Sequence, residues 1–173
     1  RRRPGAPARV HSDLVQALGR VPLLLGADGV DLASLSAHKV GGPPRVGVPV
    51  RRRGAAPAPG AFGGEQEGGL RPGTENVIGI AGSALAIELA VRERETYAQR
   101  VAAHARALWQ ELAARMPEAR LIGPPIDARD RLPNTLCVVL GRVDGKVLVT
   151  RLDLQGLEVS AGSACASGSL EPL

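Results

Sequence analysis

The chain has 173 residues, of which 44% are hydrophobic and 23% charged, which suits one ordinary domain or two small ones rather than a disordered chain. Its net charge of +5 and its pI of about 10.2 raise the hypothesis of a nucleic-acid partner, supported locally by Arg1–Arg3 and Arg51–Arg53. Against it, only 2% of the residues are aromatic, and neither arginine run is interleaved with aromatic residues or accompanied by a zinc-finger or recognition-helix signature. We therefore expect surface arginines and no nucleic-acid binding.

The cysteine count and the hydropathy pattern bear on the compartment. Two cysteines, Cys137 and Cys165, cannot make a disulfide framework, and no apolar run is long enough to span a membrane. No secretory signal is visible, so we expect a cytoplasmic protein without a membrane partner. The chain begins without an initiator methionine, and its only methionine is Met116, so we expect it to be a fragment of a longer protein.

The first part of the chain predicts a parallel α/β sheet. "ARVHSD" is typical of a short strand that runs into a helix over "LVQAL", capped by Ser12 or Asp13 and ended by Gly19. "GVDLASLSAHK" predicts a second, buried strand, which opens at Ser36 into a loop rich in Gly and Pro. Because ligands bind at the carboxyl ends of parallel strands, Asp13 and Lys39 fall where a ligand is expected.

A long loop and a long helical pattern follow. Residues 54–73 are rich in Gly and Pro, and a loop of that length is more often functional than idle. We assign the helical pattern over residues 77–116 to two helices, because it far exceeds the ~11–12 residues of an average helix. A domain boundary near Arg94 then divides the chain into residues 1–94 and 95–173.

The last part of the chain predicts strands at "ARLIG", "TLCVVLG" and "LEVS", and a helix over "DGKVLVTRLDLQG" with Asp144 as its N-cap and Gly156 as its end. Cys137 lies in the apolar "TLCVVL" and is expected in the core. Cys165 lies in "SAGSACASGS", where only small residues surround it. An exposed, mobile loop is where a reactive thiolate is expected, although an isolated exposed cysteine is more often inert.

Lysine is almost absent from this arginine-rich chain. Of the 22 Lys and Arg residues, only Lys39 and Lys146 are lysines. A guanidinium stays protonated at any working pH, whereas a desolvated amine can lose its proton and act as a nucleophile. Lys39 is therefore a candidate for chemistry that arginine cannot perform, although from the count alone chance is the simpler explanation of two lysines in a chain of this size.

Five motifs occur in order along the chain: "HSDLVQ", "SLSAHKVGGP", "GGEQEGGLRPGTEN", "LPNTL" and "SAGSACASGSLEP". Together they resemble the cysteine desulfurase family of pyridoxal-phosphate enzymes, in the class-V aminotransferase group, and most closely its iron–sulfur-cluster branch. Selenocysteine lyases share most of these motifs. The resemblance implies an α/β fold of the pyridoxal-phosphate-dependent aminotransferase type (fold type I). Residues 1–94 would be the C-terminal part of the large cofactor-binding domain, and residues 95–173 an incomplete small α+β domain.

The resemblance also implies roles for residues around the cofactor ring. Lys39 would form the Schiff base with pyridoxal 5'-phosphate, which only a deprotonable amine can do. Asp13 would face the pyridine nitrogen and keep it protonated. Gln16 would bond to the ring hydroxyl oxygen. No metal is implied.

Phosphate binding and sulfur transfer fall to other residues in the same resemblance. Ser36 and His38 would hold the phosphate together with Thr74, which would reach across from the partner subunit of a homodimer. Cys165 would be the nucleophile that takes sulfur from L-cysteine, leaving L-alanine and a persulfide. The sulfur would pass to an acceptor or iron–sulfur scaffold protein.

Departures from the family pattern limit what the resemblance implies. Arg45 stands where a glycine is common, so we expect an altered turn behind Lys39. Separately, Glu65 stands where a third glycine is common. The family's amino-terminal half and the region after "SLEPL" are absent, so we expect the isolated chain to be inactive. The competing hypotheses are a catalytically incompetent remnant that acts as an interaction module and a basic nucleic-acid binder.

Overall fold

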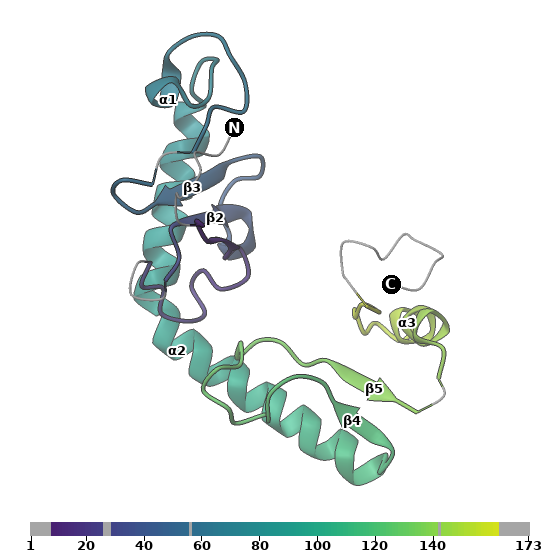
Figure 1. Ribbon diagram of the computed structural model, residues 1–173. Coiled ribbons are helices and arrows are strands. Elements are labelled where there is room, and N and C mark those ends of the chain that lie inside the picture. The colour runs from purple at the N-terminus through teal and green to yellow at the C-terminus, as the bar shows by residue number, and fades with distance from the viewer. Residues whose placement is uncertain (1–7, 26–28, 56, 142, 163–173) are drawn as a thin grey trace. The chain divides into compact units, whose positions relative to one another are not determined.

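The computed structural model describes residues 8–25, 29–55, 57–141 and 143–162 (Figure 1). The chain divides into two compact units, the first made of Arg1–Ala105 with Leu132–Thr135 and the second of Arg106–Arg131 with Leu136–Leu173. The helix α2 (Val77–Arg115) contributes residues to both units.

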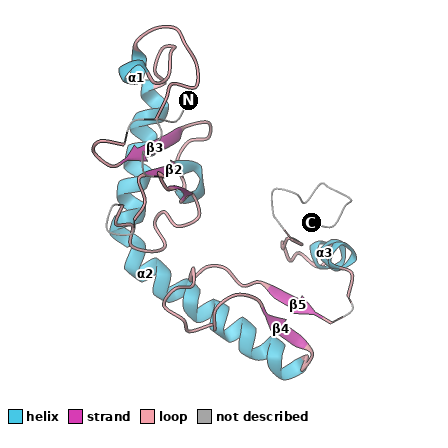
Figure 2. Ribbon diagram, viewed as in Figure 1, coloured by secondary structure: helices cyan, strands magenta, loops and turns pink. Residues whose placement is uncertain are grey.

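A three-stranded sheet lies in the first unit, with its strands in the order β1, β2, β3. Figure 2 shows β2 and β3 side by side. β1 (His11–Asp13) and β2 (Leu32–Ser36) run parallel, which confirms the parallel pair predicted from the sequence. Ala33 in β2 is only 2% exposed. β2 leads directly into η1 (Ala37–Val40), a 3-10 turn that stands where the sequence predicted an open loop.

β3 (Gly47–Arg51), which pairs antiparallel with β2, was not predicted from the sequence. Its signal is the alternation of half-buried Val46, Val48 and Val50 with exposed residues. Pro49 weakens this signal because proline cannot donate to a strand ladder. Since β3 is an edge strand, the fold tolerates that loss.

The residues after β1 form turns rather than the predicted helix. Asp13 Oδ1 accepts a hydrogen bond from Val15 N at 2.9 Å, and Leu18 N donates to Leu14 O at 3.1 Å, so a single helical turn forms. It does not extend, because Gly19 already has a left-handed φ of 68°. The predicted start and stop signals are present, but too few residues lie between them for a helix.

The helix α2 is continuous over 39 residues, so the prediction of two helices over residues 77–116 is wrong. No Gly or Pro interrupts the sequence between Gly82 and Arg115, and strong helix formers fill most of it. An average helix length was no reason to divide a run that lacks a breaking residue. The helix passes through Arg94 without interruption, and the domain boundary placed there stays a prediction.

The second unit contains the antiparallel pair β4 (Ala119–Leu121) and β5 (Val138–Leu140), both predicted. The predicted helix is α3 (Gly145–Asp153), and Oδ1 of its N-cap Asp144 accepts hydrogen bonds from Lys146 N at 2.8 Å and Val147 N at 3.2 Å. "LEVS" is not a strand, since residues 157–160 have no ladder partner within the described ranges.

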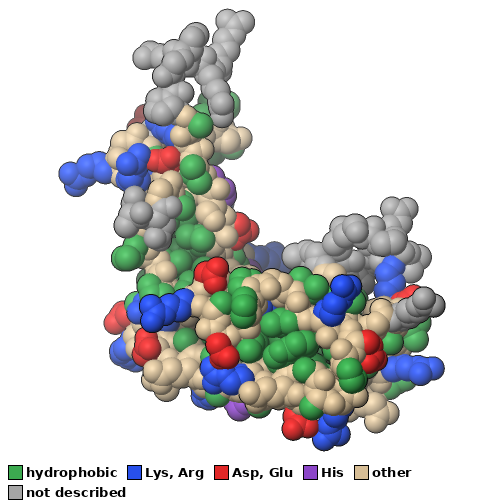
Figure 3. Space-filling view, turned by 60° about the horizontal axis from the view of Figure 1, so that its bottom comes forward, with side chains coloured by type: hydrophobic (Ala, Val, Ile, Leu, Met, Phe, Trp, Pro, Cys, Tyr) green, Lys and Arg blue, Asp and Glu red, His purple; other side chains and the backbone are tan. Residues whose placement is uncertain are grey.

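Little of the large apolar side-chain surface is buried. Among the described residues, the buried hydrophobic side chains are Leu18, Ala33, Ala37, Ala55 and Ala86. Several large hydrophobic side chains are more than half exposed, including those of Ile78, Leu108 and Leu154. Figure 3 shows hydrophobic side chains gathered on the face turned to the viewer, among charged side chains of both signs. No helix within the described ranges is both long and apolar enough to cross a membrane.

Asp31 joins the chain segments that flank the sheet at the amino end of β2. Its Oδ2 accepts a hydrogen bond from Val10 N at 3.0 Å, and its Oδ1 accepts one from Arg52 Nη2 at 2.6 Å. Its backbone groups bond to the same two residues, each at 2.9 Å. The Val10 N–H, aided by the Arg52 guanidinium, lowers the pKa of Asp31 in spite of burial, which acts in the opposite direction.

We predict that Asp31→Asn lowers the free energy of unfolding at neutral pH and that this loss shrinks as the pH falls. Because the pKa of Asp31 is lowered in the folded protein, its contribution is complete above the unfolded-state pKa of about 3.9 and disappears as the pH falls through the folded-state pKa. Urea unfolding from neutral pH to about pH 2.5 measures the difference. Asp130→Asn, at an exposed position, is the control. A difference that does not change with pH would contradict the assignment.

Candidate functional site

The carboxyl ends of β1 and β2 bring two predicted cofactor residues to one edge of the sheet. Asp13 ends β1 and Ser36 ends β2, and the parallel register sets Asp13 opposite Ser34. A 2.9 Å hydrogen bond between His11 Nε2 and Ser34 Oγ reinforces that register. Asp13 is exposed, and within the described ranges only one of its carboxylate oxygens has a partner. The other oxygen can therefore bind a ligand.

The turn η1 carries His38 and Lys39 directly beyond β2. Ser36 Oγ lies 2.6 Å from His38 Nδ1 and 3.3 Å from Val46 O, and its single proton can be donated to only one of them. His38 and Lys39 are both exposed. In the described part of the chain, the Lys39 side chain makes no hydrogen bond or ion pair. Its amine is therefore available for covalent bonding to a ligand.

Gln16 and Arg20 lie in the turns after β1. The Gln16 side chain is exposed, and its backbone carbonyl accepts a hydrogen bond from Arg20 Nη1 at 3.0 Å. Arg20 Nη2 also donates to Lys39 O at 3.3 Å, so one guanidinium contacts the backbone of two predicted site residues. Arg20 was not predicted as a site residue, because its only local signal is its position after Gly19 in an arginine-rich chain.

A face of small residues on α2 lets the loop after η1 approach the helix closely. A Cβ added at Gly79 would lie 2.8 Å from Val46 Cγ2, and one added at Gly82 would lie 3.2 Å from Pro43 Cγ. The buried residues that follow on this helix are Ser83 and Ala86. The loop behind Lys39 therefore packs on a surface that has no room for larger side chains.

Two further glycines sit at close approaches beside the site. A Cβ at Gly19 would lie 2.8 Å from Ala90 Cβ on α2 and 3.4 Å from Val40 Cγ1. A Cβ at Gly42 would lie 2.6 Å from the Cβ of Ala37, the fully buried first residue of η1. These contacts fix both the turns that carry Gln16 and the turn that carries Lys39.

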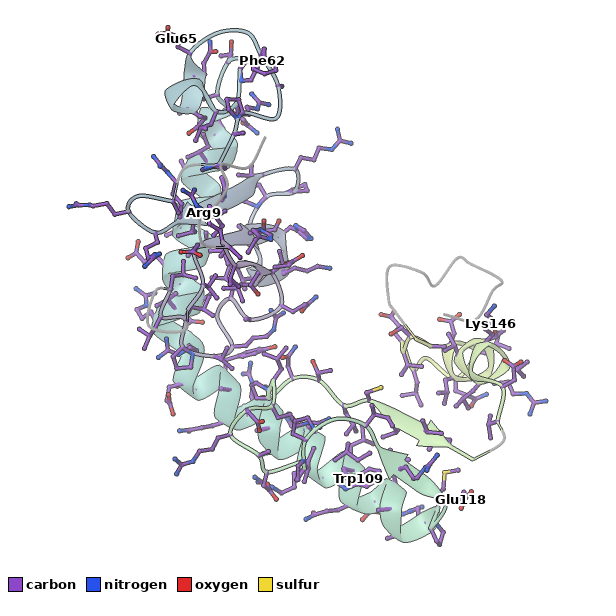
Figure 4. All side chains as sticks on the ribbon, in the orientation of Figure 1. Arg9, Phe62, Glu65, Trp109, Glu118 and Lys146 are labelled. Atoms are coloured by element: carbon purple, nitrogen blue, oxygen red, sulfur yellow. The ribbon has the colours of Figure 1, made fainter. Side chains whose placement is uncertain are left out.

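The predicted long loop over residues 54–73 is present and contains α1 (Gln66–Gly69), a single turn in which Glu67 and Gly68 have left-handed φ angles of 53° and 65°. Gln66 Oε1 accepts a hydrogen bond from Gly73 N at 3.2 Å, which ties this part of the loop to itself. Figure 4 labels Phe62 and Glu65 on this loop, and the Phe62 side chain is 91% exposed.

Thr74, at the end of this loop, is exposed. Within the described ranges, no hydrogen bond joins Thr74 to Ser36, His38 or Lys39. The structure thus brings Asp13, Ser36, His38 and Lys39 to one sheet edge, with Gln16 connected to them through Arg20. It does not bring Thr74 into contact with them.

The predictions for the two cysteines differ in outcome, because the structure describes Cys137 but not Cys165. Cys165 lies outside the described residues, and its role stays a prediction. Cys137 is exposed, so its prediction as a core residue is wrong. It lies one residue before β5, where its carbonyl accepts from Ile122 N at 2.9 Å while the side chain faces solvent. A short apolar run indicates a strand, but it does not reveal which strand face is covered.

Solved structures with this fold define the class of protein. A NifS-like protein aligns with 89% of this chain at 39% identity and a TM-score of 0.78, and the chain covers 41% of it. A NifS-like protein from Rickettsia africae aligns with 90% of this chain at 31% identity and the same TM-score of 0.78, and the chain covers 42% of it. The fold is therefore part of an α/β domain of the pyridoxal-phosphate-dependent fold-type-I class, as predicted.

The protein-family profile described as "Aminotransferase class-V" matches residues 3–173, and the chain belongs to that family. A cysteine desulfurase of Cereibacter sphaeroides is 44% identical to it over 167 residues, and the cysteine desulfurase IscS of Dictyoglomus turgidum is 43% identical over 162 residues. These alignments cover 96% and 94% of this chain but only 42% and 40% of the two relatives. The similarity to cysteine desulfurases that the five motifs indicated is confirmed.

We predict that Gly42→Ala destabilises the protein by ~1–3 kcal/mol, the usual effect of inserting a methyl group where there is no space for it. The added Cβ would meet Ala37, so η1 must shift. The matched control is Gly47→Ala, because nothing lies within 4 Å of a Cβ built there. Chemical denaturation of both variants measures the effect. Equal stabilities for the two variants would contradict the close approach at Gly42.

Proposed function

We propose that the protein containing these residues is a cysteine desulfurase that converts L-cysteine to L-alanine and leaves the sulfur as a persulfide on Cys165. The observation that carries the proposal is the gathering of Asp13, Ser36, His38 and Lys39 at the carboxyl edge of parallel strands, in a chain whose similar proteins are named cysteine desulfurases. The chain spans about 40% of the length of these relatives, so the activity of the whole protein is inferred from residues 1–173.

The described residues suit pyridoxal phosphate. Lys39 offers an amine that is free of protein partners within the described ranges, and Asp13 offers a carboxylate oxygen that is free in the same sense. The Ser36 hydroxyl and the His38 ring lie together, 2.6 Å apart, and His38 is exposed, which suits a phosphate group that accepts hydrogen bonds. These donors and acceptors match the chemistry of the cofactor's aldehyde, pyridine nitrogen and phosphate.

Each residue would then have a distinct task. Lys39 would hold the cofactor covalently through its amine, and Asp13 would keep the pyridine nitrogen protonated. Gln16 would bond to the ring hydroxyl oxygen, and Ser36 and His38 would hold the phosphate. When bound, pyridoxal phosphate supplies a sink for the electrons of the substrate Cα–H bond.

Sulfur transfer would be the task of Cys165. Its thiolate would attack the substrate sulfur, so that an S–S bond forms while the substrate C–S bond breaks. The substrate carbon keeps the electron pair and takes up a proton to become L-alanine, so the step needs no external oxidant or reductant. The persulfide would then pass its sulfur to an acceptor or iron–sulfur scaffold protein in the cytoplasm.

A homodimer would complete the phosphate site. Thr74 follows a loop that is tied to itself, and this residue is exposed and makes no hydrogen bond to the other phosphate-site residues in the described part of the chain. An exposed hydroxyl at the end of such a loop is suited to reach the site of a second subunit.

We predict that Lys39→Ala abolishes the borohydride-trappable adduct with pyridoxal phosphate and its visible absorption band. The test uses the extended protein, meaning residues 1–173 together with any flanking coding sequence. Lys146→Ala is the matched control, because Lys146 is the other lysine among residues 1–173 and lies exposed on α3. Peptide mass mapping after reduction locates the adduct. An adduct that persists in Lys39→Ala would refute the role of this lysine.

We predict that Cys165→Ser keeps the visible absorption band of the extended protein and stops alanine release from L-cysteine, because serine cannot accept sulfur. Cys137→Ser is the matched control and should release alanine at the original rate. Assays with L-selenocysteine in parallel distinguish a desulfurase from a selenocysteine lyase. The two thiols are wrongly assigned if the control loses activity and Cys165→Ser retains it.

A further inference from the structure

Two segments that are separate in sequence must be correctly spaced for the proposed site to form. The turns after β1 carry Gln16, and η1 carries Lys39. Arg20 connects them, because its Nη1 donates to Gln16 O at 3.0 Å and to Leu18 O at 3.4 Å, while its Nη2 donates to Lys39 O at 3.3 Å. We propose that Arg20 is a positioning residue that sets the spacing between Gln16 and Lys39, and thereby the place where a bound cofactor meets the Lys39 amine.

The chemistry of the guanidinium suits this task. It is planar, carries several N–H donors in a fixed arrangement and stays charged at every working pH. Two of its nitrogens therefore reach carbonyl groups on different segments at once. A lysine ammonium is a compact point charge on a flexible stem and would engage fewer of these carbonyls.

The hydrogen bonds that orient the Arg20 side chain are all made by its outer nitrogens, Nη1 and Nη2. Its Nε is buried and has no hydrogen-bond partner within the described ranges. An unsatisfied buried N–H costs free energy, so the contacts at the outer nitrogens must fix this orientation. Direct bonds from those nitrogens to two loops are the contacts that the structure provides.

Gly19, the residue before Arg20, packs closely against α2. A Cβ at Gly19 would lie 2.8 Å from Ala90 Cβ, so the turn packs tightly against α2. The same Cβ would lie 3.4 Å from Val40 Cγ1, next to Lys39. Arg20 thus extends from a turn that is anchored on α2 to the backbone of η1.

The first test uses the cofactor-free extended protein and does not depend on the proposed function. Arg20→Met removes the donors and keeps an unbranched side chain, and Arg53→Met is the control at an exposed position. Hydrogen exchange is followed at Gly41 and Gly42, whose N–H groups both donate to Ala37 O in η1. The Arg52 N–H, which donates to Asp31 O, is the reference amide.

We expect Arg20→Met to accelerate exchange at Gly41 and Gly42 about tenfold while leaving the reference amide within about twofold, because losing charge-assisted hydrogen bonds releases η1 locally. Arg20→Lys should fall between Arg20→Met and the original protein. If Arg20→Met does not fold, Arg20→Lys alone decides. Unchanged exchange at both glycines would overturn the proposal.

The second test concerns the cofactor and rests on the proposed function. Arg20→Met should raise the dissociation constant of pyridoxal phosphate about tenfold and lower the fraction of bound cofactor that borohydride traps on Lys39. Arg20→Lys should recover part of both losses, and Arg53→Met should show neither. A normal trapped fraction in Arg20→Met would overturn the positioning role. If the original protein traps no cofactor on Lys39, the proposed function fails, and the exchange test still decides on Arg20.

Discussion

The close approach of two loops to the small-residue face of α2 is the constraint on which the rest of the first unit depends. Glycines at positions 79 and 82 admit Val46 and Pro43, and Ala90 meets the turn that contains Gly19. Larger side chains on this face would push away the same segments that carry Gln16 and Lys39. Close packing against α2 therefore helps to set the positions of the segments that carry the candidate site, although α2 itself contributes no predicted cofactor residue.

The amino and carboxyl ends of the parallel strands β1 and β2 differ in how far their polar groups are already hydrogen-bonded within the protein. At the amino edge, Asp31 uses both carboxylate oxygens and both backbone groups to join Val10 and Arg52. At the carboxyl edge, Asp13 and Lys39 are exposed and retain unused bonding capacity within the described ranges. Hydrogen bonds at one edge fix the strands, so the polar groups at the other edge remain available to a ligand. This division suits a binding site, because such groups must be oriented without being satisfied by the protein.

Sequence patterns predicted the elements whose signals are local. Asp144 predicts the start of α3 because it is a favoured N-cap residue. The apolar and small residues of "GVDLASLS" predict the buried strand β2. β3 was missed because Pro49 is acceptable only on an edge strand, and edge position is a property of the whole sheet. Arg20 was missed for a similar reason, since its carbonyl partner at Lys39 lies 19 positions away. The motifs identified candidate site residues but could not identify the residue that joins their backbones.

The arginine and lysine side chains differ in the contacts that they make within the described residues. Arg20 and Arg131 each donate to more than one backbone carbonyl, and Arg52 and Arg106 pair with carboxylates. Lys39 and Lys146, in contrast, have no side-chain partner within the described ranges. Arginine bridges groups within this fold because its planar fork can satisfy several acceptors at once. These four arginine side chains are thus engaged within the protein, so fewer guanidinium groups are free to contact a nucleic-acid partner. Lys39, in contrast, is an exposed amine just beyond the carboxyl end of β2, where the proposed chemistry needs one.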